Sequence, residues 1–408
     1  MRLFCILITI FIAMITTDSY LNSSYSTLNG EGYDGVVKVT LKTNNTVYNG
    51  TGSLLYGGTA ILTAAHIFAG KSGSTSIVFD TVSTDLSSTA RRVDIHPDYD
   101  PTSASNDLAI VWLEEPAPVD ANRYELYRSG NEIFHTFEMV GYGQVGTGNT
   151  GGIDNAENLR LVAENRFEAT SETLSASSRI NLSWNPQNTL FADFDNGLAA
   201  NDLFGLFLGI TNVGLGASEG MIASGDSGGP SFIDGLLAGV ATSVIGLSSA
   251  AIDPDVDDIQ NSSFGEVGAW QRVSSFQQWI DQSLRREYIN APVTSSEVKK
   301  SVSESDNVAY FMVSYSGSIE EGSYVSVSYS TRDGTAVAGQ DYLATMGVLN
   351  IYDNEEFALI PVELIEDSEA EPDEVFYMDV TNPIGGAFVG GAIKLSAIRT
   401  IVDDDWIA

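Results

Sequence analysis

The run Gly225-Asp226-Ser227-Gly228-Gly229-Pro230 constrains this chain more than any other stretch, because glycines flank a serine that directly follows a carboxylate. A serine hydroxyl becomes a nucleophile only where a base removes its proton and donors stabilise the oxyanion that forms. Glycine at 225 has no Cβ, so its N–H can turn toward the same point as the N–H of Ser227. The run therefore predicts a nucleophilic Ser227 and an oxyanion site formed by the amides of Gly225 and Ser227.

Two upstream runs supply the other groups that such a serine needs. His66 ends the run Leu62–His66, and Asp107 stands at the start of the apolar run Asn106–Leu113. A histidine accepts the serine proton, while a buried aspartate holds the imidazole in the correct tautomer. Taken singly, each residue also fits a turn, a strand boundary or a short helix. Together, in the order His66, Asp107, Ser227, they indicate a catalytic triad with the chain order of chymotrypsin-type proteases.

Residues from about 30 to 285 resemble the trypsin/chymotrypsin family of serine proteases (peptidase S1). The resemblance rests on the three ordered motifs and on Gly141-Tyr142-Gly143, which is similar to the family's Gly-Trp-Gly. It implies an all-β fold of two six-stranded antiparallel β-barrels, with the protease domain over residues 20–289. It also implies a serine endopeptidase that works through an acyl-enzyme and needs no cofactor for catalysis. Short strand-like runs with Gly and Asn turns between Val36 and Leu113 favour the same fold.

The primary specificity pocket is also inferred from the resemblance. Its expected residues are Met221, Thr242, Val244 and Gly268. Met221 stands six residues before the nucleophile, where an aspartate would select Lys or Arg. Val244 takes the place of a glycine and would narrow the entrance. The resemblance therefore implies protein or peptide substrates that are cut after small or medium apolar residues.

The route of activation is left open by the sequence. In the family, the residue at the place of Asp226 pairs with a newly freed N-terminus. No Lys or Arg occurs between Arg2 and Lys38, so a trypsin-like cut cannot create that terminus. Either another kind of protease cuts this region, or Asp226 has a different partner.

Charge and the N-terminal segment indicate where the protein works. The 408 residues include 54 acidic and 19 basic side chains, and this surface repels nucleic acid and anionic membranes, so neither is an expected partner. Residues 1–19 combine a basic start, an apolar run and small residues, which predicts a secretory signal peptide rather than a signal anchor, and hence a secreted protein without a stable membrane span.

Cys5 is the only cysteine, so no disulfide is expected in the mature protein. Animal members of the family have a cysteine where Ile67 stands, so its absence favours a bacterial enzyme.

Two acidic stretches within the protease region are candidates for binding calcium. The first is Phe191-Ala192-Asp193-Phe194-Asp195-Asn196-Gly197, and the second is Asp253–Asp258. Carboxylates beside a glycine are able to hold calcium, but such stretches are more often solvated turns. We therefore expect a solvated turn at both.

The C-terminal part of the chain has a different character. Residues 290–297 are typical of a linker, and the alternation Tyr324–Tyr329 in the segment 298–408 predicts strands of a β-sandwich. Four motifs in this segment resemble a Calx-beta domain, an Ig-like β-sandwich: residues 331–336, 339–342, 366–374 and 403–405.

Calcium is the partner that the Calx-beta resemblance implies. Calcium prefers six to eight oxygen ligands, which carboxylates at one end of a sandwich supply. By resemblance, the ligands are Glu304, Asp341, Glu366, Asp367, Glu371, Asp403, Asp404 and Asp405. The alternative is that these acids only keep a secreted surface soluble.

The leading interpretation is therefore a secreted serine endopeptidase with a calcium-binding accessory domain. The alternative is a catalytically silent, protease-like adhesion or binding protein. The presence of His66, Asp107, Ser227 and Gly225 together favours the enzyme.

Overall fold

The computed structural model describes residues 14–16, 25, 27–83, 85–153, 159–180, 187–249 and 252–405. The chain divides into two compact units, Met1–Gln277 and Gln278–Ala408, and the predicted linker 290–297 lies within the second. Of the predicted signal peptide, only the short strand β1 (Met14–Thr16) is described; the remainder lies outside the described residues. Within the described ranges, no helix has the length and apolar character needed to cross a membrane.

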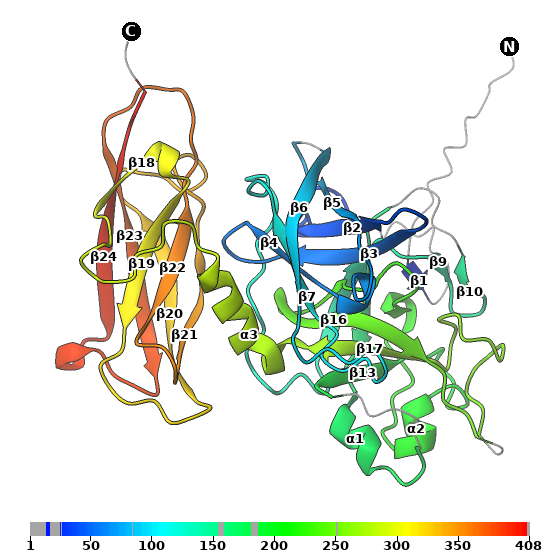
Figure 1. Cartoon of the computed structure of the whole chain (residues 1–408). Helices are drawn as coiled ribbons and strands as arrows, with labels where there is room; N and C mark the ends of the chain where they lie inside the picture. Colours follow the sequence, from blue (N-terminus) through cyan, green and yellow to red (C-terminus); the bar gives the residue numbers. More distant parts are fainter. Residues whose placement is uncertain are drawn as a thin grey trace, which may run out of the picture. The chain divides into compact units, whose positions relative to one another are not determined.

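The first unit contains a closed six-stranded antiparallel barrel with the strand order β2-β3-β4-β7-β6-β5 (Figure 1). Its strands are β2 (Val36–Lys42), β3 (Val47–Leu54), β4 (Ala60–Thr63), β5 (Ser74–Asp80), β6 (Asp85–Ile95) and β7 (Ala109–Leu113). The inward side chains, including Val39, Ile61 and Val111, are fully buried and form one core cluster. This barrel confirms the first half of the expected fold.

The second half of this unit is a seven-stranded antiparallel sheet in the order β11-β8-β15-β16-β17-β13-β12. Its strands are β8 (Thr136–Gly141), β11 (Leu161–Arg166), β12 (Ala169–Thr170), β13 (Thr189–Asp193), β15 (Pro230–Ile233), β16 (Leu236–Ile245) and β17 (Val267–Arg272). The expected second closed barrel is here a half-barrel. In the described ranges, the two-residue strand β12 pairs only with β13, so it offers β11 no ladder on which to close.

Shorter elements complete the first unit. A four-stranded sheet has the order β10 (Gly151–Ile153), β9 (Val145–Thr147), β1 and β14 (Gly220–Met221). Two short helices are α1 (Ser171–Ala176) and α2 (Leu203–Leu208). Helix α2 begins at Asp202 because that carboxylate accepts the Gly205 amide, as an N-cap does. The longer helix α3 (Val273–Arg286) spans the division between the units.

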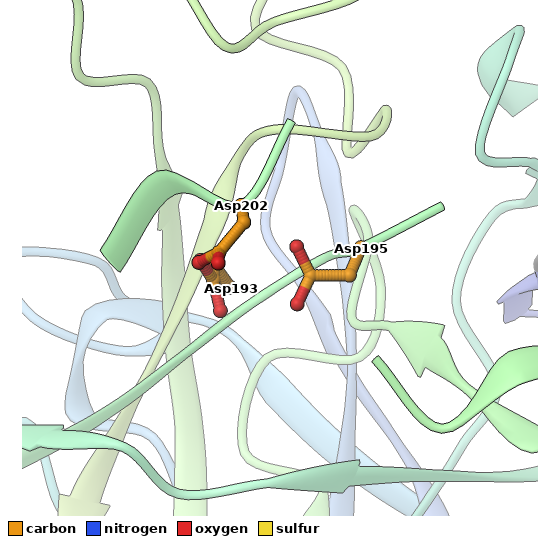
Figure 2. Close-up of side chains that lie close together, drawn as sticks. All are labelled: Asp193, Asp195 and Asp202. Carbon is orange, nitrogen blue, oxygen red and sulfur yellow. The ribbon is translucent and has the colours of Figure 1, made fainter. Parts of the chain in front are cut away.

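The acidic stretch that follows β13 differs from the sequence-based expectation. Asp193 and Asp195 are 1% and 2% exposed, so a solvated turn was the wrong interpretation. Their carboxylates face that of Asp202 at the start of α2 (Figure 2). In the second stretch, Asp253 and Asp258 are exposed and Asp255 and Asp257 are half-buried, as expected of a surface turn.

The second unit is a β-sandwich, as expected. A five-stranded sheet has the order β18-β24-β23-β20-β21, and β19 pairs with β22 in the other sheet. The strands are β18 (Ser301–Ser303), β19 (Val308–Ser314), β20 (Tyr324–Asp333), β21 (Met346–Tyr352), β22 (Phe357–Glu363), β23 (Glu374–Ile384) and β24 (Lys394–Val402). Phe311, Tyr342 and Phe376 pack between the sheets, and the rings of Tyr342 and Phe376 are stacked with centroids 4.4 Å apart.

Candidate active site

His66 lies on a 3₁₀ turn, Ala65–Ile67, that directly follows β4. The turn is anchored because Ala65 and Ile67 are buried in the core of the first barrel, while the His66 side chain keeps 35% of its surface exposed. In the sequence, the apolar residues Ala65 and Ile67 stand on either side of the polar residue His66. Packing of the two neighbours therefore directs the imidazole out of the core and toward the surface.

The structure brings His66, Asp107 and Ser227 together from three distant segments. His66 Nδ1 lies 2.7 Å from Asp107 Oδ2, and His66 Nε2 lies 2.9 Å from Ser227 Oγ. Both separations are hydrogen-bonding distances. The His66 backbone N–H also donates to Asp107 Oδ1 at 2.8 Å, which fixes the carboxylate relative to the ring. This chain of contacts has the geometry through which a histidine deprotonates a serine.

Thr242 takes part in this chain of contacts, although the sequence predicted it only as a pocket residue. Its hydroxyl donates to Asp107 Oδ2, the oxygen that faces the imidazole. Asp107 is 1% exposed, so these donors replace the water that a carboxylate would otherwise bind. The residues around Thr242 gave no indication of its hydrogen bond to Asp107, because Asp107 lies 135 positions away in the sequence.

The Ser227 loop is held against the first barrel by Thr51 of β3. The Thr51 amide donates to the Ser227 carbonyl at 2.8 Å, and its hydroxyl donates to the Gly225 carbonyl at 3.0 Å. Gly228 has φ +84°, and a Cβ there would lie 2.0 Å from Thr63 Oγ1, so only glycine fits. Gly225 likewise has φ +101°. The sequence did not single out Thr51, because its contact with the loop exists only after β3 has paired.

Ser227 lines two adjoining cavities. One, of about 660 Å³, is also lined by His66, Tyr48 and Tyr142. The other, of about 230 Å³, includes Thr242, Val244 and Ser262 among its lining residues. The two cavities share Gln144, Ser224 and Ser227 in their linings.

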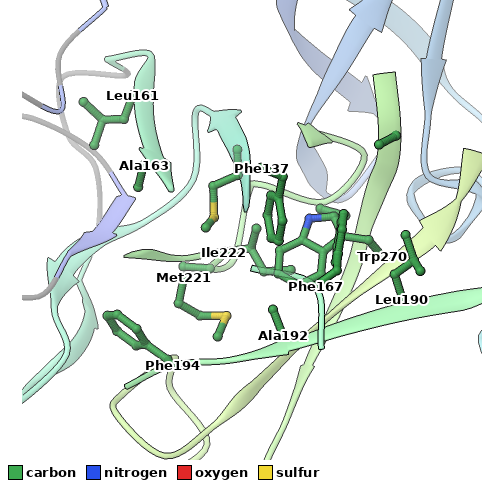
Figure 3. Packing of buried hydrophobic residues seen from close by; sticks show 14 of the residues in the cluster. Phe137, Leu161, Ala163, Phe167, Leu190, Ala192, Phe194, Met221, Ile222 and Trp270 are labelled. Atoms are coloured by element: carbon green, nitrogen blue, oxygen red, sulfur yellow. The ribbon is translucent and has the colours of Figure 1, made fainter. Parts of the chain in front are cut away.

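The remaining expected pocket residues, Met221 and Gly268, are not among the residues that line the smaller cavity. Met221 is fully buried, and its side chain lies beside Ala192, Phe194 and the aromatic group around Trp270 (Figure 3). A Cβ on Gly268 would come within 2.8 Å of the Met221 sulfur. These two residues therefore lie close together, and Gly268 pairs with Val244, which lines the cavity.

Asp226 is bound by backbone amides. Its Oδ1 accepts the Gly143 N–H and its Oδ2 accepts the Ala223 N–H, both at 2.8 Å. Burial raises the pKa of this carboxyl to about 7. In the uncut chain, two backbone amides therefore hold this carboxylate.

The acids of the second unit gather in the loops at one end of the sandwich. Asp341 and Glu371 offer carboxylate oxygens within 4.8 Å of one another, together with Glu374, which the sequence analysis did not select. Asp403 Oδ2 accepts the Glu371 amide at 2.9 Å, and Glu304 Oε1 accepts the Asp367 amide at 3.0 Å.

The other expected ligands are not members of that group of three. Asp404 Oδ2 accepts hydrogen bonds from the hydroxyls of Ser303 and Ser305. Glu366 is exposed in the loop after β22, and Asp405 lies near Glu304. An oxygen set centred on Asp341, Glu371 and Glu374 fits a hard cation.

Comparison with known proteins agrees with both halves of the chain. The family model for trypsin matches residues 29–199, and the model for the Calx-beta domain matches residues 290–405. The chain is 28% identical over 243 residues to trypsin of Phaedon cochleariae, covering 57% of this chain and 77% of the relative. It is 38% identical over 82 residues to the sodium/calcium exchanger Calx of Drosophila melanogaster, which is 20% of this chain but only 8% of the exchanger. Neuropsin, a serine protease expressed in the limbic system of mouse brain, has 17% identity and a TM-score of 0.45, with 64% of this chain and 98% of the neuropsin chain covered.

The closed barrel, the adjoining half-barrel and the two matches to trypsin define a trypsin-like serine protease domain. In particular, the chain is an S1 protease domain fused to a C-terminal Calx-beta domain.

Proposed function

We propose that this protein is an active serine endopeptidase. The observation that carries the proposal is the continuous contact from Asp107 through His66 to Ser227, with separations of 2.7 and 2.9 Å. A catalytically silent adhesion protein would have no use for a buried carboxylate aimed at an imidazole that in turn faces an accessible hydroxyl. The geometry favours the enzyme over that alternative.

The proposed reaction proceeds in two halves. His66 Nε2 takes the Ser227 proton as Oγ attacks the peptide carbonyl, and the oxyanion is stabilised by the amides of Gly225 and Ser227. The imidazolium, held by Asp107, then gives its proton to the leaving amine, and the C–N bond breaks to leave an acyl-enzyme. Water, deprotonated by His66, hydrolyses the ester and restores Ser227.

A fluorophosphonate probe tests this proposal directly, because it forms a covalent bond only with an activated serine. We expect the folded, full-length protein to be labelled at Ser227, and Ser227→Ala to show no labelling. Ser178→Ala, which changes an exposed serine, should be labelled like the wild type. A folded wild-type protein that resists the probe would support the silent alternative.

Substrate preference is proposed to follow from the small cavity beside Ser227. Val244 lines this cavity, and Met221, which is buried, replaces the charged residue that would select Lys or Arg. Both features favour a small or medium apolar side chain before the scissile bond and offer no partner for Lys or Arg.

Val244→Gly should widen this pocket. We expect kcat/KM for substrates with Phe or Tyr to rise relative to kcat/KM for substrates with Ala or Val. The ratio should increase by roughly 10-fold or more, because loss of the Val244 side chain makes room for an aromatic ring in the pocket. A library of fluorogenic peptides measures the ratio. Val82→Gly, at an exposed loop position, should leave the profile unchanged. An unaltered profile in Val244→Gly would show that another residue sets the preference.

The Calx-beta domain is proposed to bind calcium through Asp341, Glu371 and Glu374. In the inactive Ser227→Ala background, calcium should raise the melting temperature of the sandwich relative to protein in EDTA, as a ligand of the native state does. Differential scanning calorimetry should show the shift lost in Asp341→Asn/Glu371→Gln and kept in Glu320→Gln, an exposed control. Equal shifts in all three proteins would contradict this site.

Export from the cell is part of the same proposal. It is supported by the apolar run that ends near Ile15 and by the strongly acidic composition, with a formal net charge of -35. Sequencing the N-terminus of protein recovered from culture medium would identify the cleavage site and any activating cut.

A further inference from the structure

Five carboxylates from separate segments are buried together in the protease unit. Asp193 ends β13, Asp195 follows it, and Asp202 caps α2; Glu168 precedes β12, and Glu219 precedes β14. Each of the five is at most 2% exposed. One oxygen from each of Asp193, Asp195 and Asp202 lies within 4.8 Å of the others (Figure 2).

Backbone amides orient part of this cluster. Asp193 Oδ2 accepts the Phe204 N–H at 2.8 Å, and Asp202 Oδ1 accepts the Gly205 N–H at 2.6 Å. Glu219 Oε1 accepts the Asp195 N–H at 2.8 Å. The second oxygens of Asp202 and Glu219 also accept amides, from Asn212 and Leu215, so the oxygens without a donor belong to Asp193, Asp195 and Glu168.

Several oxygens of the cluster have no donor. Among the described residues, no hydrogen bond reaches Asp193 Oδ1, either oxygen of Asp195 or either oxygen of Glu168. The charged groups that act on Asp195 are Glu219, Glu168 and Asp202, all of them acidic. Buried carboxylates without a donor or a counter-charge are costly, and a protein retains them where a cation completes the site.

We infer that Asp193, Asp195, Asp202, Glu168 and Glu219 form a calcium site inside the protease unit, separate from the acids of the Calx-beta domain. The donors are all oxygen, as a hard cation requires, and the five unpartnered oxygens approach the six to eight that calcium takes. Magnesium retains several waters and an octahedral shell, which a nearly solvent-free, all-carboxylate cluster serves poorly. The site is the opposite of the solvated turn that the local sequence suggested.

The position of this site links it to the substrate pocket. Glu219 is two residues before Met221, and Ala192, next to Asp193, pairs with Gly268. Asn165 Nδ2 donates to the carbonyls of both Asp193 and Gly220, at 2.9 and 3.0 Å. A cation here would fasten together the strands that support the pocket. Only this consequence rests on the proposed peptidase function; binding of the ion does not.

Calcium binding is tested on full-length Ser227→Ala protein that also carries Asp341→Asn/Glu371→Gln, so that neither self-cleavage nor the sandwich contributes. After removal of metal with EDTA, isothermal titration with CaCl₂ should show one ion per chain, and calcium should raise the melting temperature of the protease transition. Adding Asp195→Asn should abolish both effects. Adding Asp234→Asn, an exposed aspartate in the β15–β16 hairpin, should preserve both.

The outcomes that overturn the site are distinct from failure of catalysis, because the tested protein is already inactive. Absence of both heat and a melting shift would show that the cluster holds protons instead of a cation. Binding unchanged by Asp195→Asn would place the ion elsewhere, and magnesium binding as tight as calcium would refute the assignment of the ion. Should Asp195→Asn fail to fold, Glu168→Gln provides the second variant, with the same loss expected.

Discussion

Asp107→Asn is expected to lower kcat/KM by on the order of 10⁴-fold while the protein remains folded. The amide occupies the same volume, and its single oxygen can still accept the backbone N–H of His66, which in the wild type binds Oδ1. It cannot present two accepting oxygens, so His66 loses the partner that keeps its Nδ1 protonated and its Nε2 free to accept the Ser227 proton. Steady-state kinetics on an apolar peptide substrate measures the effect.

The loss should lie in kcat rather than in KM, because Asp107 does not line either cavity that would hold substrate. Asp98→Asn, at an exposed position in the same segment, should retain wild-type kinetics. Near wild-type kcat in Asp107→Asn, with intact circular dichroism, would mean that His66 is oriented by other groups and that this carboxylate is structural.

Arg160→Met should reduce the free energy of unfolding by about 3–5 kcal/mol, because it leaves a buried carboxylate without its counter-charge. Arg160 Nη2 lies 3.0 Å from Asp34 Oδ1, and both side chains are 1% exposed. The same guanidinium donates to Thr27 Oγ1 at 2.8 Å and to the Asp80 carbonyl at 3.0 Å. It therefore connects the start of β11 with the segment before β2 and with the end of β5.

Urea denaturation in the Ser227→Ala background measures this loss without self-cleavage. The double variant Asp34→Asn/Arg160→Met should recover part of the stability, since the unpaired charge is removed. Arg92→Met breaks a pair with Asp94 in which both side chains are about 40% exposed, and it should cost about 1 kcal/mol or less. Similar losses for Arg160→Met and Arg92→Met would contradict the argument from burial.

The sequence predicted the triad because the necessary residue types stand in short, recognisable runs. Ser227 lies among glycines, and His66 and Asp107 each adjoin an apolar strand. The predicted barrel followed from alternating apolar residues, whose inward side chains are buried. The sequence predicted a second closed barrel where the structure has a half-barrel. Closure depends on whether the outer strands β11 and β12 pair, and such pairing joins segments far apart in the chain.

Residues that act through distant partners escaped prediction. Thr242 reaches Asp107, and Thr51 holds the Ser227 loop, yet neither has a motif around it. Asp195 gives the clearest case. Its neighbours Asn196 and Gly197 are typical of an exposed turn, but packing of the following segment buries its carboxylate beside four other acids.

By itself, the sequence determined the two kinds of domain and the candidate residues of a triad, because both depend on residue types at short spacing along the chain. Only the tertiary structure decided which carboxylates are buried, which donors they receive and which are left facing one another. These properties depend on the removal of water by segments that are remote in sequence, and no local pattern records which segments those will be.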